Sequence, residues 1–320
     1  MQVPRRWRAI TLAVIGAALL LAPAGASAQE AGPYDMFNRC PLDDPRMQAP
    51  DNDTVTCVNA TTNGGSLQIG RTPIASTDGF PVNVQFGLRE PADGEVETIS
   101  QPGAVQATPV PVPGGLVGVV GEANLKRLFG PAIVDAVNRV TATVEQAGEI
   151  ANFDINGALT GTPVFDLPVK LHLRHPLLGA NCYIGSNADP IVFHPQSGTT
   201  APPPPNEPIT GVAGTLGSVI LPPGNRVPGA TNTFIIKQED ATLVDNSFAV
   251  PKARGCGPLG LLDGAINQRQ TLPQAAGANT VILEDNDSHL GLAGPSATLG
   301  LSPAQVMELL VAPGLFEPTP

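Results

Sequence analysis

The sequence predicts a mainly β fold: an antiparallel β-sandwich or barrel-like domain with a broken helix over about residues 122–147, a short C-terminal helix and two disulfides. Three observations support this prediction. The chain contains 35 Gly and 35 Pro, so turn-forming residues are dense. Between the turns, Val, Ile and Leu alternate with polar residues, as they do in half-buried strands. The four Cys are an even number and follow an N-terminal segment typical of exported proteins.

Residues 1–28 have the pattern of a secretory signal peptide. Three Arg lie within the first eight residues, an apolar run over 9–22 follows, and Ala26-Ser-Ala28 offers a cleavage site of small residues. The apolar run is too short to span a bilayer. We therefore expect a secreted, extracellular protein whose mature chain begins at Gln29.

The cysteines are expected to form disulfides, because thiols pair and stay paired in an oxidising exterior. Among the three possible pairings we prefer Cys40 with Cys57 and Cys182 with Cys256. The first two share a short segment rich in Pro and Asp, and the other two lie in similar loops flanked by Gly. A zinc site would need tighter clustering of the four residues.

The clearest strand pattern covers residues 165–174, where apolar residues alternate with polar ones from Phe165 to Leu173. Pro168 has no N–H to donate, so we expect an edge or bulged strand. A second alternation, over 82–88, predicts a half-buried strand. Shorter candidates, each bounded by Gly, Pro or Asn, cover residues 67–69, 191–193, 219–221, 233–237, 247–250 and 280–283.

Two segments have the spacing of helices instead. Over 122–149 apolar residues recur every three or four positions, and Gly130-Pro131 interrupts them, which predicts a short helix to Phe129 and a longer one from Pro131 to about Ala147. Near the C-terminus, Ser302-Pro-Ala-Gln305 has the form of a capping box before an apolar stripe. We expect a helix of two or three turns there.

Two Pro-rich tracts, 108–115 and 199–208, are expected to be rigid, extended connectors. We interpret residues 29–320 as a single β-rich secreted domain. The alternative is two subdomains, 29–115 and 116–320, divided at the first tract.

Four segments resemble an uncharacterised family of secreted actinobacterial proteins. They are Asn181-Cys-Tyr-Ile-Gly-Ser186 with its flanks, the tract Thr199-Thr-Ala-Pro-Pro-Pro-Pro-Asn206, the early stretch 57–70 and the late stretch 261–277. Together they extend over most of the mature chain. The resemblance implies an exported protein; the family has no assigned activity, so no catalytic or binding residue is carried over from it.

Charge and composition argue against several classes of partner. The formal net charge is −11, which disfavours nucleic acid and anionic lipid surfaces because binding to both depends on Lys and Arg. No second apolar run of membrane-spanning length follows the signal peptide, so we expect no membrane insertion after cleavage. Aromatic residues are scarce, which counts against a lectin or a polysaccharide hydrolase.

The sequence contains only weak candidates for catalytic residues. The nucleophile elbow Gly-x-Ser-x-Gly does not occur, and the nearest Ser candidates are Ser186 and Ser218. His172 and His175 are three residues apart, but on a strand they would point to opposite faces. No phosphate-binding or dinucleotide-binding Gly motif is present. We therefore assign no catalytic residue, no metal ligand and no cofactor.

Three features of the sequence could bind a ligand. The segments 51–54 and 284–288 are rich in oxygen ligands and could hold calcium, although solvated turns are the default interpretation. Lys170, His172 and Arg174 would form a cationic strip on one face of their strand, either docking an anion or acting as gatekeepers at a sheet edge. We prefer the gatekeeper interpretation.

The function predicted from these observations is that of a non-enzymatic structural or interaction protein, as a component of the cell envelope or of the extracellular space. The alternative is a secreted hydrolase of unrecognised type. A deep pocket that encloses two close carboxylates, or a Ser–His contact, would distinguish the two. The partner itself is not identifiable from the sequence.

Overall fold

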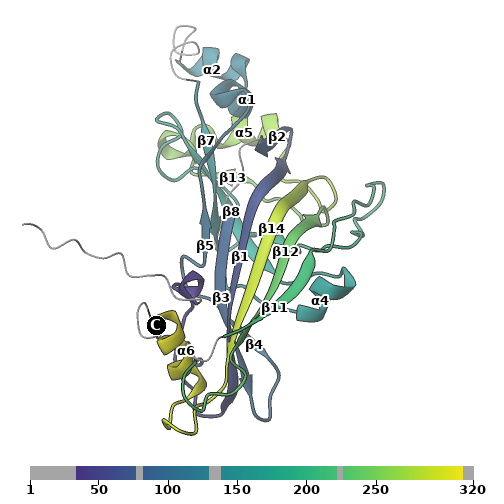
Figure 1. Cartoon of the computed structure of the whole chain (residues 1–320). Coiled ribbons are helices and arrows are strands. Elements are labelled where there is room, and N and C mark those ends of the chain that lie inside the picture. The colour runs from purple at the N-terminus through teal and green to yellow at the C-terminus, as the bar shows by residue number, and fades with distance from the viewer. Residues whose placement is uncertain (1–33, 77–81, 130–137, 222–225, 313–320) are drawn as a thin grey trace, which may run out of the picture.

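An 18-residue strand, β1 (Asn52–Ile69), is central to the fold. In the computed structural model, which describes residues 34–76, 82–129, 138–221 and 226–312, β1 pairs with β14 (Thr280–Ala293) on one side and β3 (Val82–Pro91) on the other. Both pairings are antiparallel and place successive side chains on opposite faces. The long, twisted strands of this sheet run through most of the molecule (Figure 1).

The structure confirms a mainly β fold built from antiparallel sheets. The larger sheet has the order β11-β12-β14-β1-β3-β4, with β2 added to β1 and β5 to β3. Its remaining strands are β2 (Thr72–Ser76), β4 (Glu97–Ile99), β5 (Val105–Ala107), β11 (Thr215–Ile220) and β12 (Phe234–Asp245). The smaller sheet has the order β13-β9-β8-β7-β6, with β10 added to β8. Its strands are β6 (Val110–Pro111), β7 (Thr141–Gln146), β8 (Leu167–Arg174), β9 (Tyr183–Ile184), β10 (Ile191–Phe193) and β13 (Ala253–Arg254).

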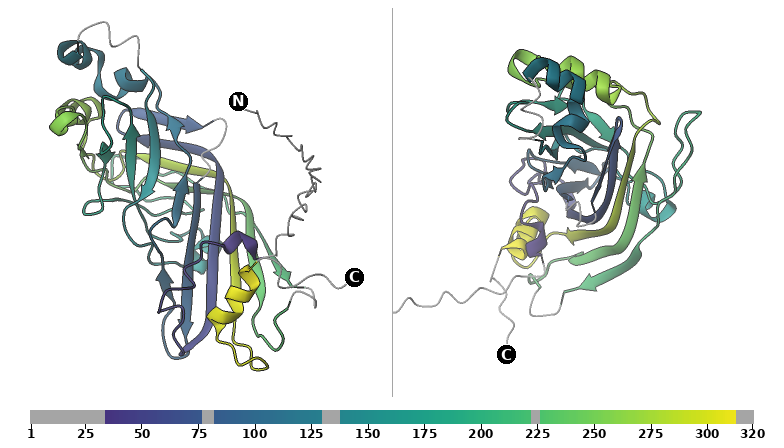
Figure 2. Two further views of the ribbon diagram at one scale, coloured as in Figure 1. Left: turned by 90° about the vertical axis from the view of Figure 1, so that its left-hand side faces the viewer. Right: turned by 90° about the horizontal axis from the view of Figure 1, so that it is seen from above.

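Helices cover the ends and one face of the sheets (Figures 1 and 2). Three of them, α1 (Gly115–Val120), α2 (Glu122–Phe129) and α5 (Asp263–Gln270), lie together at one end of the molecule. A fourth, α4 (Ile155–Thr160), lies beside β11 and β12. The C-terminal helix α6 (Pro303–Val311) packs on the larger sheet next to the 3₁₀ turn η1 (Asp35–Phe37); a second 3₁₀ turn, η3, spans Pro258–Gly260. Within the described ranges, no helix combines the length and the apolar character needed to cross a bilayer.

The two faces of the larger sheet belong to two hydrophobic cores. Val58 and Phe86 lie on the inner face, which packs towards the smaller sheet. Val55 and Cys57 lie on the outer face, under η1 and α6. Because both faces are covered, the middle of β3 is buried on both sides; the prediction of a half-buried strand over 82–88 was therefore right about the strand and wrong about its exposure.

A row of glycines on the outer face lets the N-terminal segment lie close to the sheet. Gly87 and Gly291 flank Cys57 in the register. A Cβ atom added at Gly291 would lie 2.5 Å from the ring of Phe37, and one added at Gly87 would lie 2.8 Å from Met47. The absence of these Cβ atoms makes room for the covering side chains.

Both predicted disulfides are confirmed. Cys40 bonds to Cys57 and so attaches the N-terminal segment to β1. Cys182 bonds to Cys256 and joins the segments around β9 and β13. The predicted C-terminal helix is confirmed as α6, which begins with the full capping box: Ser302 accepts from the Gln305 backbone N–H, and the Gln305 side chain accepts from the Ser302 N–H.

The long half of the predicted broken helix is wrong. Residues 131–137 lie outside the described residues, but Thr141–Gln146, which we expected to be helical up to Ala147, form β7. Val140, Ala142 and Val144 also alternate with period two, and this segment is rich in β-branched residues. Pairing with β8 decides between the two periods in favour of the strand.

The predicted edge position of β8 is also wrong, because β8 pairs with β7 on one side and with β9 and β10 on the other. Pro168 is tolerated near the start of this central strand. Its carbonyl accepts from Ala147, which lies just past the end of β7, so on that side the missing N–H falls beyond Gln146–Val169, the last pair of the β7–β8 ladder.

Among the shorter candidates, the segment 247–250 is not a strand; Val250 makes only an isolated bridge to Gln274. The others fall within or overlap β1, β10, β11, β12 and β14. The oxygen-rich segments 51–54 and 284–288, interpreted as turns by default, lie largely in β1 and β14.

Candidate functional site

A cavity of about 460 Å³ lies between the inner face of the larger sheet and the smaller sheet. The floor comes from β1, β3, β12 and β14, the opposite wall from β7, β8 and β10, and the side from α4 and β11. Its volume lies within the range of about 300–1,000 Å³ that proteins use for small-molecule ligands. It is the leading candidate for a functional site among the described residues.

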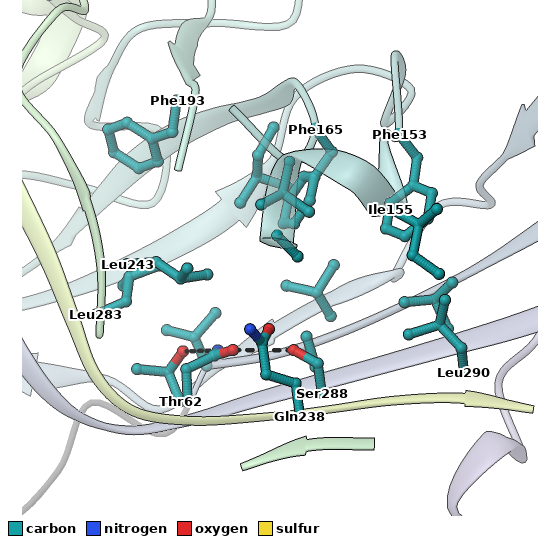
Figure 3. A pocket seen from close by; sticks show the side chains of 18 of the residues that line it. Thr62, Phe153, Ile155, Phe165, Phe193, Gln238, Leu243, Leu283, Ser288 and Leu290 are labelled. Carbon is teal, nitrogen blue, oxygen red and sulfur yellow. Dashed lines mark hydrogen bonds between the residues drawn. The ribbon is translucent and has the colours of Figure 1, made fainter. Parts of the chain in front are cut away.

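The lining is predominantly apolar, and among the described residues it carries no ionisable side chain: none of its described members is Asp, Glu, His, Lys or Arg. Apolar side chains point into the space from both sheets and from the segments that flank α4, among them Phe193 of β10 and, from those segments, Phe153 and Phe165 (Figure 3). The six polar lining residues are all uncharged: Thr62, Ser66, Ser218, Gln238, Asn286 and Ser288. Such a surface favours hydrocarbon and offers no partner to a charged group.

The short helix α4 forms a side wall of the cavity. Asp154 caps its N-terminus by accepting from the backbone N–H of Asn156 at 2.9 Å, and Gly161 ends it in the left-handed conformation. Ile155, Ala158 and Leu159 share the helix face that lines the cavity.

The opening of the cavity lies where α4 faces the edge strand β11. Ile155 is 38% exposed, and Leu159 and Leu216 are each 52% exposed, although all three line the cavity. Large apolar side chains that reach solvent beside an apolar cavity provide an entry route for an apolar ligand.

Aromatic side chains stiffen the walls. Phe86 packs against Phe153 and Phe165, with ring centroids 5.5 Å and 5.8 Å apart. Phe193 meets Phe248 edge-on at 4.7 Å. Each contact joins different segments of the chain, so the walls are held by tertiary packing.

Polar side chains form a band across the middle of the floor. Gln238 of β12 pairs in register with Ser288 of β14, and Asn286 of β14 pairs with Thr62 of β1. The Ser288 hydroxyl donates to Asn286 Oδ1 at 2.9 Å, and Asn286 Nδ2 donates to Thr62 Oγ1 at 2.8 Å (Figure 3). We call these four residues the polar band.

The sequence-derived nucleophile candidates do not form a catalytic pair. Ser186 accepts from the backbone N–H of Asp189 in a turn, and Ser218 lines the cavity, where there is no histidine. Across the described ranges, no serine hydroxyl is hydrogen-bonded to a histidine. Among the described residues of this cavity, neither a pair of carboxylates nor a Ser–His contact is present.

Two histidines do pair with carboxylates elsewhere. His172 Nδ1 lies 2.7 Å from Glu145, and His194 Nδ1 lies 2.8 Å from Asp166. His172 also contacts the carbonyl of Ala180 through its other nitrogen. These contacts fix the rings but supply no nucleophile.

The predicted cationic strip is largely engaged by neighbouring groups. Arg174 lies 3.6 Å from Glu145, and Lys170 donates to Asn187 at 2.9 Å. Lys170 also sits over the ring of Tyr183, and His172 stacks on that ring. Since β8 is a central strand, the gatekeeper interpretation is wrong.

Of the oxygen-rich segments, one takes part in a carboxylate cluster. Asp285 and Asp287 of β14 lie close to Asp240 of β12, with carboxylate oxygens within 4.8 Å of one another. Two of the three residues are exposed, and Asp287 accepts from the Asp240 backbone N–H. Nothing else in the described surroundings indicates a bound ion.

Sequence reasoning missed the cavity and its polar band. The signal available was a polar residue at an inward position between apolar ones, such as Gln238 between Ile236 and Leu243. The Asp and Asn residues around the outward positions of β14 obscured this pattern, because they are typical of turns.

Comparison with known proteins gives no further guidance, because no protein-family model, curated protein or solved structure matches the chain.

Proposed function

We propose that this protein is an exported, non-enzymatic binding protein that encloses an apolar ligand between its two sheets. The observation that carries the proposal is the cavity of about 460 Å³, whose described lining is predominantly apolar and contains no ionisable side chain. Burial of apolar surface supplies about 25 cal/mol per Å², so an extended hydrocarbon in this space gains affinity without any charged contact.

The arrangement of the walls supports the proposal in two ways. The aromatic contacts and the two sheets hold the cavity in place, so a ligand meets walls that are already formed. The exposed apolar rim at Ile155, Leu159 and Leu216 gives the ligand an apolar path inward. A lipid hydrocarbon chain is the ligand class that fits both features.

The test is binding of the neutral, environment-sensitive dye Nile red to the full, disulfide-bonded protein. We expect saturable fluorescence enhancement and competition by a long-chain hydrocarbon. Ala60 lies on the cavity floor, so Ala60→Trp fills the space and is expected to abolish saturable binding. Ala92→Trp, the same change at an exposed position in the β3–β4 turn, is the control and should bind as the wild type does.

A second matched pair guards against misfolding of Ala60→Trp. Ser218 and Val219 are neighbours on β11, but only Ser218 lines the cavity. Ser218→Trp is expected to weaken dye binding at the opening, and Val219→Trp to leave it unchanged. Saturable binding that persists in both cavity variants, or its absence in the wild-type protein, would refute the proposal.

A further inference from the structure

The polar band lies in the middle of the cavity floor, with apolar surface on both sides of it. Along β12, Gln238 lies between Ile236 and Leu243; along β14, Asn286 and Ser288 lie between Leu283 and Leu290. Figure 3 shows the same order: Leu243 and Leu283 on one side, Leu290 with Ile155 on the other, and the polar side chains between them.

Gln238 is buried and has no hydrogen-bonding partner for its amide among the described residues. Only 7% of the residue is exposed, and its side chain points into the cavity (Figure 3). An amide can donate two hydrogen bonds and accept two. The amide reaches the cavity space without a partner from the described residues, so its hydrogen bonds are expected to go to whatever fills the cavity.

The row of hydrogen bonds next to Gln238 ends in a second donor group, the hydroxyl of Thr62. The Ser288 hydroxyl donates to Asn286, and Asn286 donates to Thr62. Thr62 is 3% exposed, and its own hydroxyl hydrogen has no acceptor among the described side chains. The Gln238 amide and the Thr62 hydroxyl therefore present two donor groups with unused hydrogens to the middle of the cavity.

We infer that the ligand carries an uncharged hydrogen-bonding group in its interior, such as an ester or a mid-chain hydroxyl, with a hydrocarbon arm on each side. This inference rests on the proposed function and specifies its ligand class. The internal group of the ligand contacts Gln238 and Thr62 in the polar band, and the two arms occupy the apolar surfaces on either side.

A terminal carboxylate or phosphate fits this cavity poorly. None of its lining residues in the described part of the chain is Lys, Arg or His, so a charged head group would be buried there without a counter-ion. A pure hydrocarbon would leave the amide of Gln238 unpaired. The uncharged internal group satisfies both constraints.

Three competitors with the same number of non-hydrogen atoms test the inference: decyl octanoate, its isomer octadecanoic acid, and eicosane. Each competes with Nile red at neutral pH. The wild-type protein is expected to bind the ester about tenfold more tightly than the alkane, the effect of pairing one buried polar group, and more tightly than the ionised acid.

Gln238→Leu removes the amide but keeps a side chain of similar size. It is expected to bind ester and alkane equally, with the alkane bound at least as tightly as by the wild type. Ile236→Ala, on the same strand and face, is the control, because it removes apolar surface from the cavity floor. The affinities for ester and alkane should both fall, and the preference for the ester should remain. Gln238→Met serves as a second variant should Gln238→Leu fail to fold.

Each outcome bears on a different claim. Equal binding of ester and alkane by the wild type, or an ester preference that persists in Gln238→Leu, would overturn this inference while the proposed function stands. Dye binding that none of the three competitors displaces would overturn it as well. Absence of dye and hydrocarbon binding altogether would overturn the proposed function.

Discussion

His289 lies on the outer face of β14, between Asn59 of β1 and Lys237 of β12 in the register. Burial lowers the pKa of its imidazole. Asp287 and Glu239 oppose this shift by attracting the proton, whereas Lys237 acts in the same direction as burial. The folded protein therefore takes up a proton at this position less readily than the unfolded chain does.

This shift predicts a pH dependence of stability. Histidine ordinarily titrates near pH 6.5, so above that value both states are neutral at His289 and its contribution to stability is constant. As the pH falls through about 6.5 towards the lower pKa of the folded state, the unfolded chain binds the proton first and the free energy of unfolding decreases. In His289→Gln this part of the decrease should disappear.

Urea unfolding of the wild type and His289→Gln at a series of pH values between about 5 and 8 checks the prediction. The two curves should run parallel above the ordinary histidine pKa and diverge below it. Parallel curves over the whole range would contradict the assigned role of His289.

At the scale of elements, α6 depends on its capping box and on the core beneath the outer face. Ser302 accepts from the Gln305 N–H, and Ala304, Val306, Met307 and Leu310 are buried against the sheet. Ser302→Ala removes the acceptor and is expected to lower the free energy of unfolding by about 1 kcal/mol.

Ser302→Asp keeps a side-chain oxygen at the N-cap and should retain most of the stability. Equilibrium denaturation of both variants beside the wild type measures the difference. A loss in Ser302→Asp as large as that in Ser302→Ala would show that the hydroxyl acts through some other contact.

Elements with a single strong local signal could be predicted from the sequence. The alternation around Leu171 gave β8, and the Ser302–Gln305 box gave α6. Where two periods coexisted, as at Val140 and Val144, local pattern could not decide, because the choice depended on pairing with β8. The edge assignment failed for the same reason: the partners of β8 on its second side come from residues 183–193, which no local pattern identifies.

At the scale of the whole molecule, the two disulfides close loops of different reach. Cys40 and Cys57 are 17 residues apart, and their loop stays on the outer face. Cys182 and Cys256 are 74 residues apart, and their loop leaves the smaller sheet, passes through β11 and β12 of the larger sheet and returns. In the unfolded chain, the second bond therefore keeps segments that will form strands of both sheets within one closed loop.

Replacing each pair by serines is expected to destabilise the protein unequally. By loop entropy, loss of Cys40–Cys57 should cost about 3 kcal/mol and loss of Cys182–Cys256 about 4 kcal/mol. Guanidinium unfolding of Cys40→Ser/Cys57→Ser and Cys182→Ser/Cys256→Ser measures both values. A larger loss for the shorter loop would mean that local packing under η1, rather than chain entropy, determines the effect.

The cavity is a property of the whole fold, which explains why the sequence did not reveal it. Its lining comes from residues between Val58 and Leu290, on eight strands, the helix α4 and the segments that flank this helix. The disulfide pairing could be inferred because the chemistry of cysteine narrows the choices to three. No comparable rule relates Thr62 to Gln238 and Asn286, which meet only once the register of β1, β12 and β14 is set.

The packing of η1 against α6 brings residues 34 and 312, the two extremes of the described chain, to the side of the sheet that faces away from the cavity (Figures 1 and 2). A tether or fusion partner joined through either extreme would therefore attach on the sheet face opposite the cavity. The cavity opening between α4 and β11 would stay accessible to solvent. Capture on a sensor chip by a terminal tag should consequently preserve uptake from solution.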